Sequence, residues 1–426
     1  MTPLSSRTGH FQAVLDRYQA DRRLPSLVVG VLDQGELAWS GSAGAETTID
    51  TQYRIGSITK TLTAVLVLQC RDDGLLSLDD PIGTHVPETG YAAASVESLL
   101  AHVSGMQSEP VGPWWERSPG VGIEQLLADN PGSGAVFGTR ERYHYSNLAF
   151  GLLGEAVARL RGTPWMSSVQ TRILDPLGMT RTSYLPQAPY AEGLSVHHLA
   201  GTLTPEPAYD TGAMAPAGQL WSTIEDLARF ASFLAVGNAA VLAPETVAQM
   251  RRAVDPAPDY GLGMRLLPWS GGMLAGHTGS MPGFQAALFA DPLTHVGVVA
   301  LTNATTGFSG TELTQALLGS WTPGPGAPWV PTVAVPEWAR ELFGYWHWGN
   351  SAYEVRWTND QLEWRDLARS TTAETFALSG DRIIGTAGYH HGETLHVARN
   401  DDGSIHHLDC ATFIYTKHPY PYPDNE

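Results

Sequence analysis

The positions of the predicted strands constrain the fold of this chain most. Two strands joined by a tight turn are predicted near the N-terminus, over 26–32 and 36–42, and four more are predicted within 261–302. The segment between these groups is dominated by short helices and loops, including apolar helical stretches over 62–68 and 148–160. Strands at both ends with helices between them predict that the two ends share one sheet, which is an α+β layout.

A change in composition divides the chain near residue 322. The segment from Thr322 to Pro328 is rich in proline and glycine, and beyond it short stretches alternate polar and apolar residues between tight turns. This pattern is typical of a small antiparallel β-barrel. We therefore predict a first domain over 1–321, a linker over 322–332, a barrel domain over 333–417 and a disordered tail over 418–426.

Charge and composition exclude several kinds of partner. The formal net charge is −18, and 43% of the residues are hydrophobic, as in an ordinary globular protein. An acidic chain lacks the basic surface that nucleic acids and anionic membranes require. No apolar run is long enough to cross a bilayer, and the first residues lack the apolar core of an export signal. The two cysteines lie far apart in sequence, so we expect a reducing compartment and a cytoplasmic protein.

Lysine is almost absent, and one of its two copies stands in an unusual place. Of the 25 Lys and Arg residues only Lys60 and Lys417 are lysines. Lys60 follows Ser57 by three residues at the start of an apolar helix predicted to end at Gly74, where the helix dipole disfavours an ammonium. Lysine can lose its proton there, and arginine cannot. A deprotonatable amine beside a hydroxyl indicates an activated serine nucleophile, although a lone Ser-x-x-Lys also arises by chance.

Two further motifs lie downstream, Tyr145-Ser146-Asn147 before a predicted helix and His277-Thr278-Gly279-Ser280 at the end of a predicted strand. A phenol beside an ammonium ionises more easily and can pass on a proton, and an amide can hold Lys60 and a substrate carbonyl. Gly279 would let a substrate lie close to the backbone, and the N–H groups of Ser57 and Ser280 could face an oxyanion. Taken singly, Tyr145 is better explained by packing, and His277 is equally compatible with an ordinary histidine at a strand end that bonds to a neighbour.

In this order, the three motifs resemble those of the penicillin-recognising serine hydrolases. The most similar branch contains class C β-lactamases, D-alanyl-D-alanine carboxypeptidases, D-aminopeptidases and related esterases. The stretches 53–56, 99–106, 216–223 and 260–264 are similar to the same family, and the resemblance covers roughly 10–320. It implies a β-lactamase/transpeptidase-like antiparallel sheet flanked by helices, a helical subdomain and an acyl-enzyme mechanism.

The resemblance also implies a role for each motif residue. Ser57 would be the nucleophile and Lys60 the partner that accepts or positions its proton, while Tyr145 would act as general base and proton relay. Whether Lys60 or Tyr145 is the base stays open, because the two groups should titrate together. The substrate and the oxyanion would be held by Asn147, His277, Thr278, Gly279 and Ser280.

One departure from the family pattern bears on the substrate. Class C β-lactamases have lysine where this chain has His277, and a histidine is mostly uncharged at neutral pH, which disfavours strong binding of anionic β-lactams. The C-terminal barrel resembles the lipocalin-like domain of some D-aminopeptidases. Both features favour a peptidase-, amidase- or esterase-like hydrolase of small substrates. A β-lactamase, and a non-catalytic scaffold or assembly protein that retains the fold, are the alternatives.

The expected partners follow from these interpretations. We expect a small-molecule or short-peptide substrate and no nucleic-acid or membrane partner, and we leave a homo-oligomer open. We expect no cofactor and no metal site, because the paired histidines at 390–391 and 406–407 lie on predicted strands where neighbouring side chains point to opposite faces.

Overall fold

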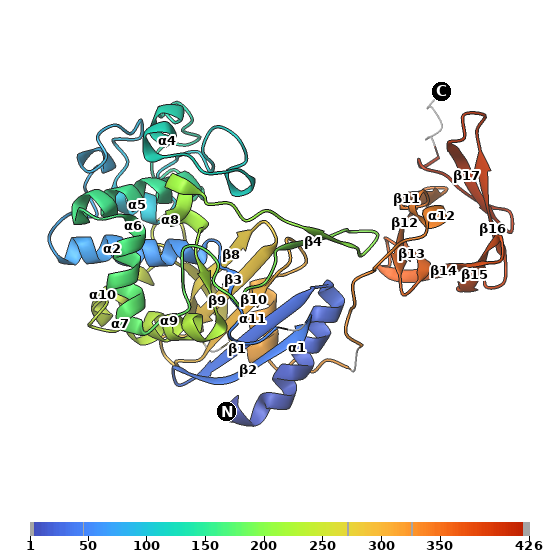
Figure 1. Cartoon of the computed structure of the whole chain (residues 1–426), viewed down its shortest axis with the longest axis horizontal. Helices are drawn as coiled ribbons and strands as arrows, with labels where there is room; N and C mark the ends of the chain where they lie inside the picture. The colour runs from blue at the N-terminus through green and yellow to red at the C-terminus, as the bar shows by residue number, and fades with distance from the viewer. Residues whose placement is uncertain (1–3, 46, 271, 325–326, 421–426) are drawn as a thin grey trace. The chain divides into compact units, whose positions relative to one another are not determined.

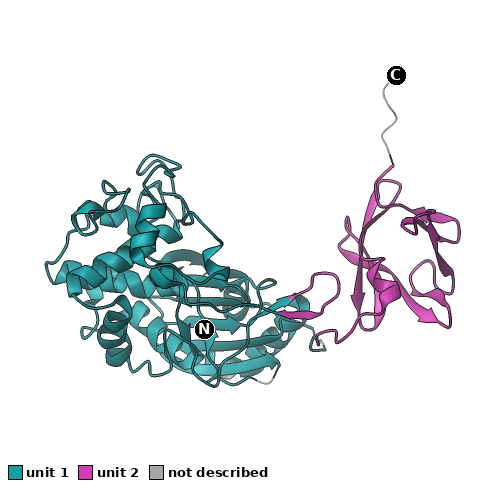
Figure 2. Ribbon diagram, turned by 45° about the horizontal axis from the view of Figure 1, so that its top comes forward, with its two compact units in different colours: residues 1–195, 205–329 teal, residues 196–204, 330–426 magenta. Residues whose placement is uncertain are grey.

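The computed structural model describes residues 4–45, 47–270, 272–324 and 327–420. The chain divides into two units (Figure 2). The first consists of residues 1–195 and 205–329, and the second of residues 196–204 and 330–426. Most of the tail predicted to be disordered, residues 421–426, and residues 325–326 of the predicted linker lie outside the described residues.

The first unit is built on a six-stranded antiparallel sheet that joins both ends of the unit. Its strand order is β2-β1-β10-β9-β8-β7. Val29 near the N-terminus lies opposite Ala300 across the β1–β10 pair, which confirms the predicted α+β layout. The strands are β1 (Ser26–Asp33), β2 (Glu36–Gly44), β7 (Arg265–Trp269), β8 (Gly272–Met281), β9 (Phe284–Ala290) and β10 (Gly297–Thr302).

Helices cover both faces of this sheet (Figure 1). Helix α1 (Thr8–Arg22) and helix α11 (Gly310–Leu318) pack on one face, where Val29 contributes to their apolar cluster. Helix α2 (Ile58–Asp72) and helix α9 (Ile224–Val236) share the larger cluster on the other face with Val28. Because both faces are covered, β1 reads as a nearly continuous apolar strand, and all its residues except Asp33 are buried.

A helical region surrounds α2, in which every residue from Ile58 to Cys70 is buried. An apolar helix of this kind needs neighbours on all sides. These neighbours include α5 (Asn147–Arg161) and α8 (Ala215–Gly218). The other helices of the unit are α3 (Val96–Leu100), α4 (Ile123–Asp129), α6 (Trp165–Val169), α7 (Asp175–Leu177) and α10 (Pro244–Met250). Among the described helices, none combines the length and apolarity needed to span a bilayer.

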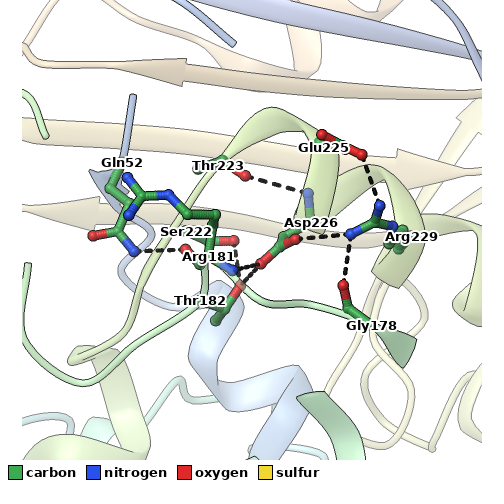
Figure 3. Close-up of polar contacts among 9 residues, drawn as sticks. All are labelled: Gln52, Gly178, Arg181, Thr182, Ser222, Thr223, Glu225, Asp226 and Arg229. Atoms are coloured by element: carbon green, nitrogen blue, oxygen red, sulfur yellow. Dashed lines mark hydrogen bonds and ion pairs between the residues drawn. The ribbon is translucent and has the colours of Figure 1, made fainter. Parts of the chain in front are cut away.

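A buried carboxylate fixes the strand pair that leads into Ser57 (Figure 3). Asp226 at the start of α9 accepts hydrogen bonds from the Arg181 N–H and the Thr182 hydroxyl, each 2.8 Å long. The Thr182 hydroxyl is also 2.8 Å from that of Ser222, in β6 (Trp221–Ser222). Strand β6 pairs with β3 (Tyr53–Arg54), and the chain continues from β3 directly into the turn that precedes Ser57. The network therefore holds the backbone that positions Ser57.

The second unit contains an eight-stranded antiparallel sheet that curls into a nearly closed barrel, as the sequence predicts. Its first and last strands meet where His347 and Thr416 exchange two backbone hydrogen bonds of 2.8 and 2.9 Å. Trp346, Trp364 and Phe376 fill the core. A helix, α12 (Glu337–Arg340), precedes the strands β11 (Gly344–Trp348), β12 (Ser351–Thr358), β13 (Gln361–Asp366), β14 (Thr371–Ser379), β15 (Arg382–Ala387), β16 (Thr394–Arg399), β17 (Ile405–Cys410) and β18 (Phe413–Tyr415).

A hairpin from the middle of the chain completes the second unit. It is formed by β4 (Leu194–Val196) and β5 (Leu203–Pro205), and residues 196–204 group with the barrel. Ala200 lies in the barrel's core cluster, and the Leu199 carbonyl accepts a 2.7 Å hydrogen bond from the Trp357 N–H. The domain boundaries predicted from the sequence did not include residues 196–204 with the barrel. They and the lipocalin-like interpretation of the barrel remain predictions.

Candidate active site

The turn that precedes Ser57 lies against the end of strand β8, and two glycines permit this contact. Gly56 has φ +51°, and a side chain there would collide with the backbone of Ser280. A side chain at Gly279 would collide with the Ile55 carbonyl. Gly279 therefore makes room for the protein's own backbone, a role that the sequence analysis did not consider. The close approach brings the backbones of Ser57 and Ser280 together.

The Ser57 hydroxyl and the Lys60 amine are in direct contact. Ser57 precedes the first residue of α2, and its Oγ lies 3.0 Å from Lys60 Nζ. The amine also donates a 2.6 Å hydrogen bond to the Ala217 carbonyl in α8. Lys60 is completely buried, and this burial lowers its pKa from 10.5 to about 7. A substantial fraction of the amine is therefore neutral at physiological pH.

Tyr145 is the residue before Ser146, the N-cap of α5, and it lies beside Ser57 in the site. Ser146 caps α5 by accepting a hydrogen bond from the Ala149 N–H, and this holds the start of the helix. Tyr145 and Ser57 line the same cavity, and Lys60 Nζ lies 5.0 Å from the centre of the Tyr145 ring. Burial raises the pKa of the Tyr145 phenol, so this group stays protonated at neutral pH.

Asn147 is held by an acidic side chain that sequence reasoning missed. Its Nδ2 donates a 2.7 Å hydrogen bond to Glu109 Oε1, and the Trp115 indole N–H donates one of 2.6 Å to Glu109 Oε2. The Asn147 amide therefore has a defined orientation, with its N–H toward Glu109. Glu109 itself is exposed and follows the stretch over 99–106 whose similarity to the family was noted.

His277 is buried on β8 and is 1% exposed. Its Nε2 lies 2.9 Å from the Tyr260 hydroxyl, and its Nδ1 lies 2.5 Å from the Thr278 carbonyl. Burial, and secondarily the positive charge of Arg265, lowers its pKa well below the usual 6.5. The ring is therefore neutral at physiological pH, as the sequence analysis reasoned for an ordinary histidine.

A cavity of about 360 Å³ opens over the nucleophile. Six of the eight site residues predicted from the sequence line this cavity, and the other two, Lys60 and Asn147, are not lining residues. Arg265 on β7 also lines the cavity, and among the described residues its side chain has no hydrogen-bond or ion-pair partner. No sequence motif predicted that Arg265 would lie at this site, because its position depends on how β7 pairs with β8. The six predicted lining residues are Ser57, Tyr145, His277, Thr278, Gly279 and Ser280.

Comparison with known proteins finds curated relatives and solved structures that are similar to this chain. Penicillin-binding protein 4 of Amycolatopsis lactamdurans is 28% identical over 356 residues, covering 73% of this chain and 89% of that protein. The match to Beta-lactamase-like protein 2 of Dictyostelium discoideum spans only 46% of the length of that protein. The octameric penicillin-binding protein homologue from Pyrococcus abyssi superposes with a TM-score of 0.67 at 22% identity, covering 96% of this chain and 99% of that one.

A D-amino acid amidase from Ochrobactrum anthropi SV3 has the same fold as the first unit. It gives a TM-score of 0.62 at 23% identity and covers 73% of this chain and 97% of that chain. Residues 335–417 match a domain family of unknown function, DUF7586. Residues 11–319, which hold the sheet, the helical region and the whole cavity over Ser57, match the Beta-lactamase family. The chain therefore belongs to the Beta-lactamase family of serine hydrolase-like proteins.

Proposed function

We propose that this protein is a serine hydrolase that cleaves amide or ester bonds of small substrates through an acyl-enzyme on Ser57. The observation that carries the proposal is the 3.0 Å contact between Ser57 Oγ and Lys60 Nζ, with the amine buried and its pKa lowered to about 7. A neutral amine at hydrogen-bond distance from a hydroxyl is the arrangement that generates an alkoxide-like nucleophile.

The pKa directions favour Lys60 over Tyr145 as the base. Neutral Lys60 takes the Ser57 proton as Oγ attacks the substrate carbonyl, and the tetrahedral oxyanion faces the N–H groups of Ser57 and Ser280. The Tyr145 hydroxyl, protonated at neutral pH, passes a proton to the leaving amine or alcohol and regains one from the Lys60 ammonium. The carbonyl–leaving-group bond breaks and leaves an ester on Ser57. Lys60 then deprotonates the water that hydrolyses this ester.

Glu109 favours a substrate with a free amino group. This exposed carboxylate lies beside Asn147, the residue proposed to orient the substrate carbonyl, so an ammonium next to the scissile bond would meet a negative charge there. The similarity to a D-amino acid amidase supports the same reading. We therefore propose D-amino-acid amides and short peptides as the first substrates to test.

Arg265 favours a second candidate, a β-lactamase. The sequence analysis disfavoured anionic β-lactams because His277 carries no charge, but Arg265 places a permanent cation in the same cavity. Nitrocefin hydrolysis at a kcat/KM above that for D-aminoacyl p-nitroanilides would establish this alternative. Slower nitrocefin turnover would retain the amidase proposal.

The test of the proposed function is loss of activity in Ser57→Ala. The variant should lose at least about 10³-fold in kcat against p-nitrophenyl esters and D- and L-aminoacyl p-nitroanilides, because no other hydroxyl contacts Lys60 in the described structure. Ser167→Ala, at an exposed serine of α6, is the matched control and should keep full activity. Intact-mass detection should find an acyl adduct on wild type only.

Two results would count against the proposal. Activity that survives in Ser57→Ala would reject Ser57 as the nucleophile. Absence of turnover together with absence of labelling by a fluorophosphonate or a fluorescent penicillin would instead favour a non-catalytic scaffold.

A further inference from the structure

A chain of hydrogen bonds runs behind the cavity from the start of α5 to β8. The Ser146 N–H lies 3.1 Å from His102 Nδ1, and His102 Nε2 lies 3.1 Å from the Tyr260 hydroxyl. That hydroxyl lies 2.9 Å from His277 Nε2, and His277 Nδ1 lies 2.5 Å from the Thr278 carbonyl. The three side chains are 0–2% exposed, so bulk water cannot replace any of these bonds.

The two ends of this chain fix the direction of every bond in it. A backbone N–H can only donate, so His102 Nδ1 accepts, and the neutral ring carries its proton on Nε2. That proton is donated to the Tyr260 oxygen, which leaves the Tyr260 O–H to donate to His277 Nε2. A carbonyl can only accept, so His277 Nδ1 carries its proton toward Thr278. The Ser146 end thus requires a neutral His102, and both ends agree with a neutral His277 whose Nε2 accepts from the Tyr260 O–H.

Protonation of His277 would break this order. A proton on its Nε2 would turn this nitrogen into a donor, so the Tyr260 oxygen would face two N–H groups and the buried Tyr260 O–H would lose its acceptor. Arg265 on β7 and Lys60 on α2 also oppose a positive charge at this ring. The other titratable groups near it in the described structure are His102, which is joined to it through Tyr260, and two protonated phenols. Tyr260 packs on its edge, the Tyr145 ring centre lies 6.2 Å away, and burial raises the pKa of both.

We propose that His102 and Tyr260 are positioning residues that hold His277 as its neutral Nδ1–H tautomer, which leaves Arg265 to receive an anionic group of the substrate. The inference rests on the proposed function, since it assigns roles within the same cavity. It predicts that binding of an anionic substrate does not depend on a histidine charge. The preference for such a substrate should therefore stay constant between about pH 5.5 and 8.5.

The first test reads the tautomers without any substrate. Long-range ¹H–¹⁵N spectra of the full-length protein with ¹⁵N-labelled histidine, assigned with His102→Gln and His277→Gln, should show Nε2–H for His102 and Nδ1–H for His277. Neither signal should titrate between about pH 5.5 and 8.5. The opposite tautomer at either ring, or titration within this range, would overturn the proposal even if the protein proves to be an active hydrolase.

The second test compares two esters that differ by one carboxylate, 4-nitrophenyl acetate and 3-carboxy-4-nitrophenyl acetate. In wild type the ratio of their kcat/KM values should be flat with pH, and Arg265→Gln should lower the preference for the carboxylated ester about tenfold. Tyr260→Phe removes the donor that stabilises neutral His277, so the ratio should rise as the pH falls. His102→Gln keeps an N–H for Tyr260 and should keep the flat profile.

The outcomes of the ester test separate the two proposals. A flat profile in a folded Tyr260→Phe protein, or an unchanged ratio in Arg265→Gln, would overturn the roles assigned here while hydrolysis itself persists. Failure of wild type to hydrolyse either ester would count against the proposed function, and the tautomer measurement would still decide the hydrogen-bond chain.

Discussion

Two side chains of the site, Lys60 and Tyr145, receive opposite pKa shifts from the same cause. Burial disfavours the charged form of each, so the amine becomes neutral near pH 7 while the phenol stays protonated. Burial therefore suits one group to accept a proton and the other to deliver it. Enzymes commonly separate acid and base roles in this way.

Replacing Lys60 tests whether loss of its proton matters. Lys60→Arg keeps a cation but cannot supply a neutral base, so kcat should fall by about 10³-fold or more. Lys417→Arg is the natural control, because Lys417 is the other lysine of the chain and its Nζ lies 3.9 Å from the Trp346 ring centre in the barrel. Its steady-state kinetics should equal those of wild type. An active Lys60→Arg variant would contradict the role of the amine.

The pH profile should report the same group. Neutral Lys60 is the active form and exists above its pKa, so kcat/KM should rise with pH through about 7. Glu109 is the nearby charge that most raises the pKa of Lys60, and Glu109→Gln keeps an acceptor for Asn147 while removing that charge. The midpoint of the variant should therefore lie at lower pH. A midpoint that moves upward would argue against this electrostatic coupling.

The sequence predicts the local part of the site better than the distant part. Ser57 and Lys60 lie one helical turn apart, so their spacing alone brings them together. Arg265 and Glu109 reach the site through the pairing of β7 with β8 and through a loop, and no local spacing encodes either arrangement. The hydrogen-bond chain from His102 through Tyr260 to His277 likewise depends on three separate segments.

At the scale of secondary-structure elements, the Asp226 network should contribute measurably to stability. Asp226→Ala leaves the Arg181 N–H and the Thr182 hydroxyl without this acceptor in a buried place, and this should lower the free energy of unfolding by about 1–3 kcal/mol. Glu225→Ala, one residue earlier, removes an exposed ion pair with Arg229 and should cost less than about 0.5 kcal/mol. Urea denaturation of both variants measures the difference, and equal losses would contradict it.

Element boundaries differ from the sequence predictions where glycine changes the backbone. The first of the four strands predicted within 261–302 begins only at Arg265, because β7 is Arg265–Trp269. Gly263 adopts φ +70°, and a side chain there would collide with Ala64, so the chain turns before the strand begins. The apolar pattern of the last helix of the first unit indicates a start near 312, and α11 begins earlier, at Gly310, because Ser309 caps it.

At the scale of the whole molecule, the shared sheet was predictable and the hairpin over 196–204 was not. Alternating and apolar strands at both ends of the first unit leave few other ways to bury them. The hairpin is short, and its main core contribution is the small side chain of Ala200. Hydrophobic periodicity carries almost no signal for such a segment.

The hairpin should be part of the barrel's cooperative unit. Ala200→Asp puts an unpaired carboxylate into the barrel core and should lower the melting temperature of the second unit selectively. Thr204→Asp, at an exposed position of the same hairpin, is the control and should change little. Scanning calorimetry with tryptophan fluorescence should resolve the two units. A uniform shift of every transition, or none, would show that the hairpin does not belong to the barrel.

The contact between Gly56 and Ser280 has a consequence for protein synthesis. About half of the chain lies between Ser57 and Ser280, and strands β8, β9 and β10 are translated after the whole helical region. A growing polypeptide therefore carries its reactive alcohol and amine long before the opposing wall exists. Under the proposed function, a product terminated before β8 would lack the Ser280 N–H and would be inactive.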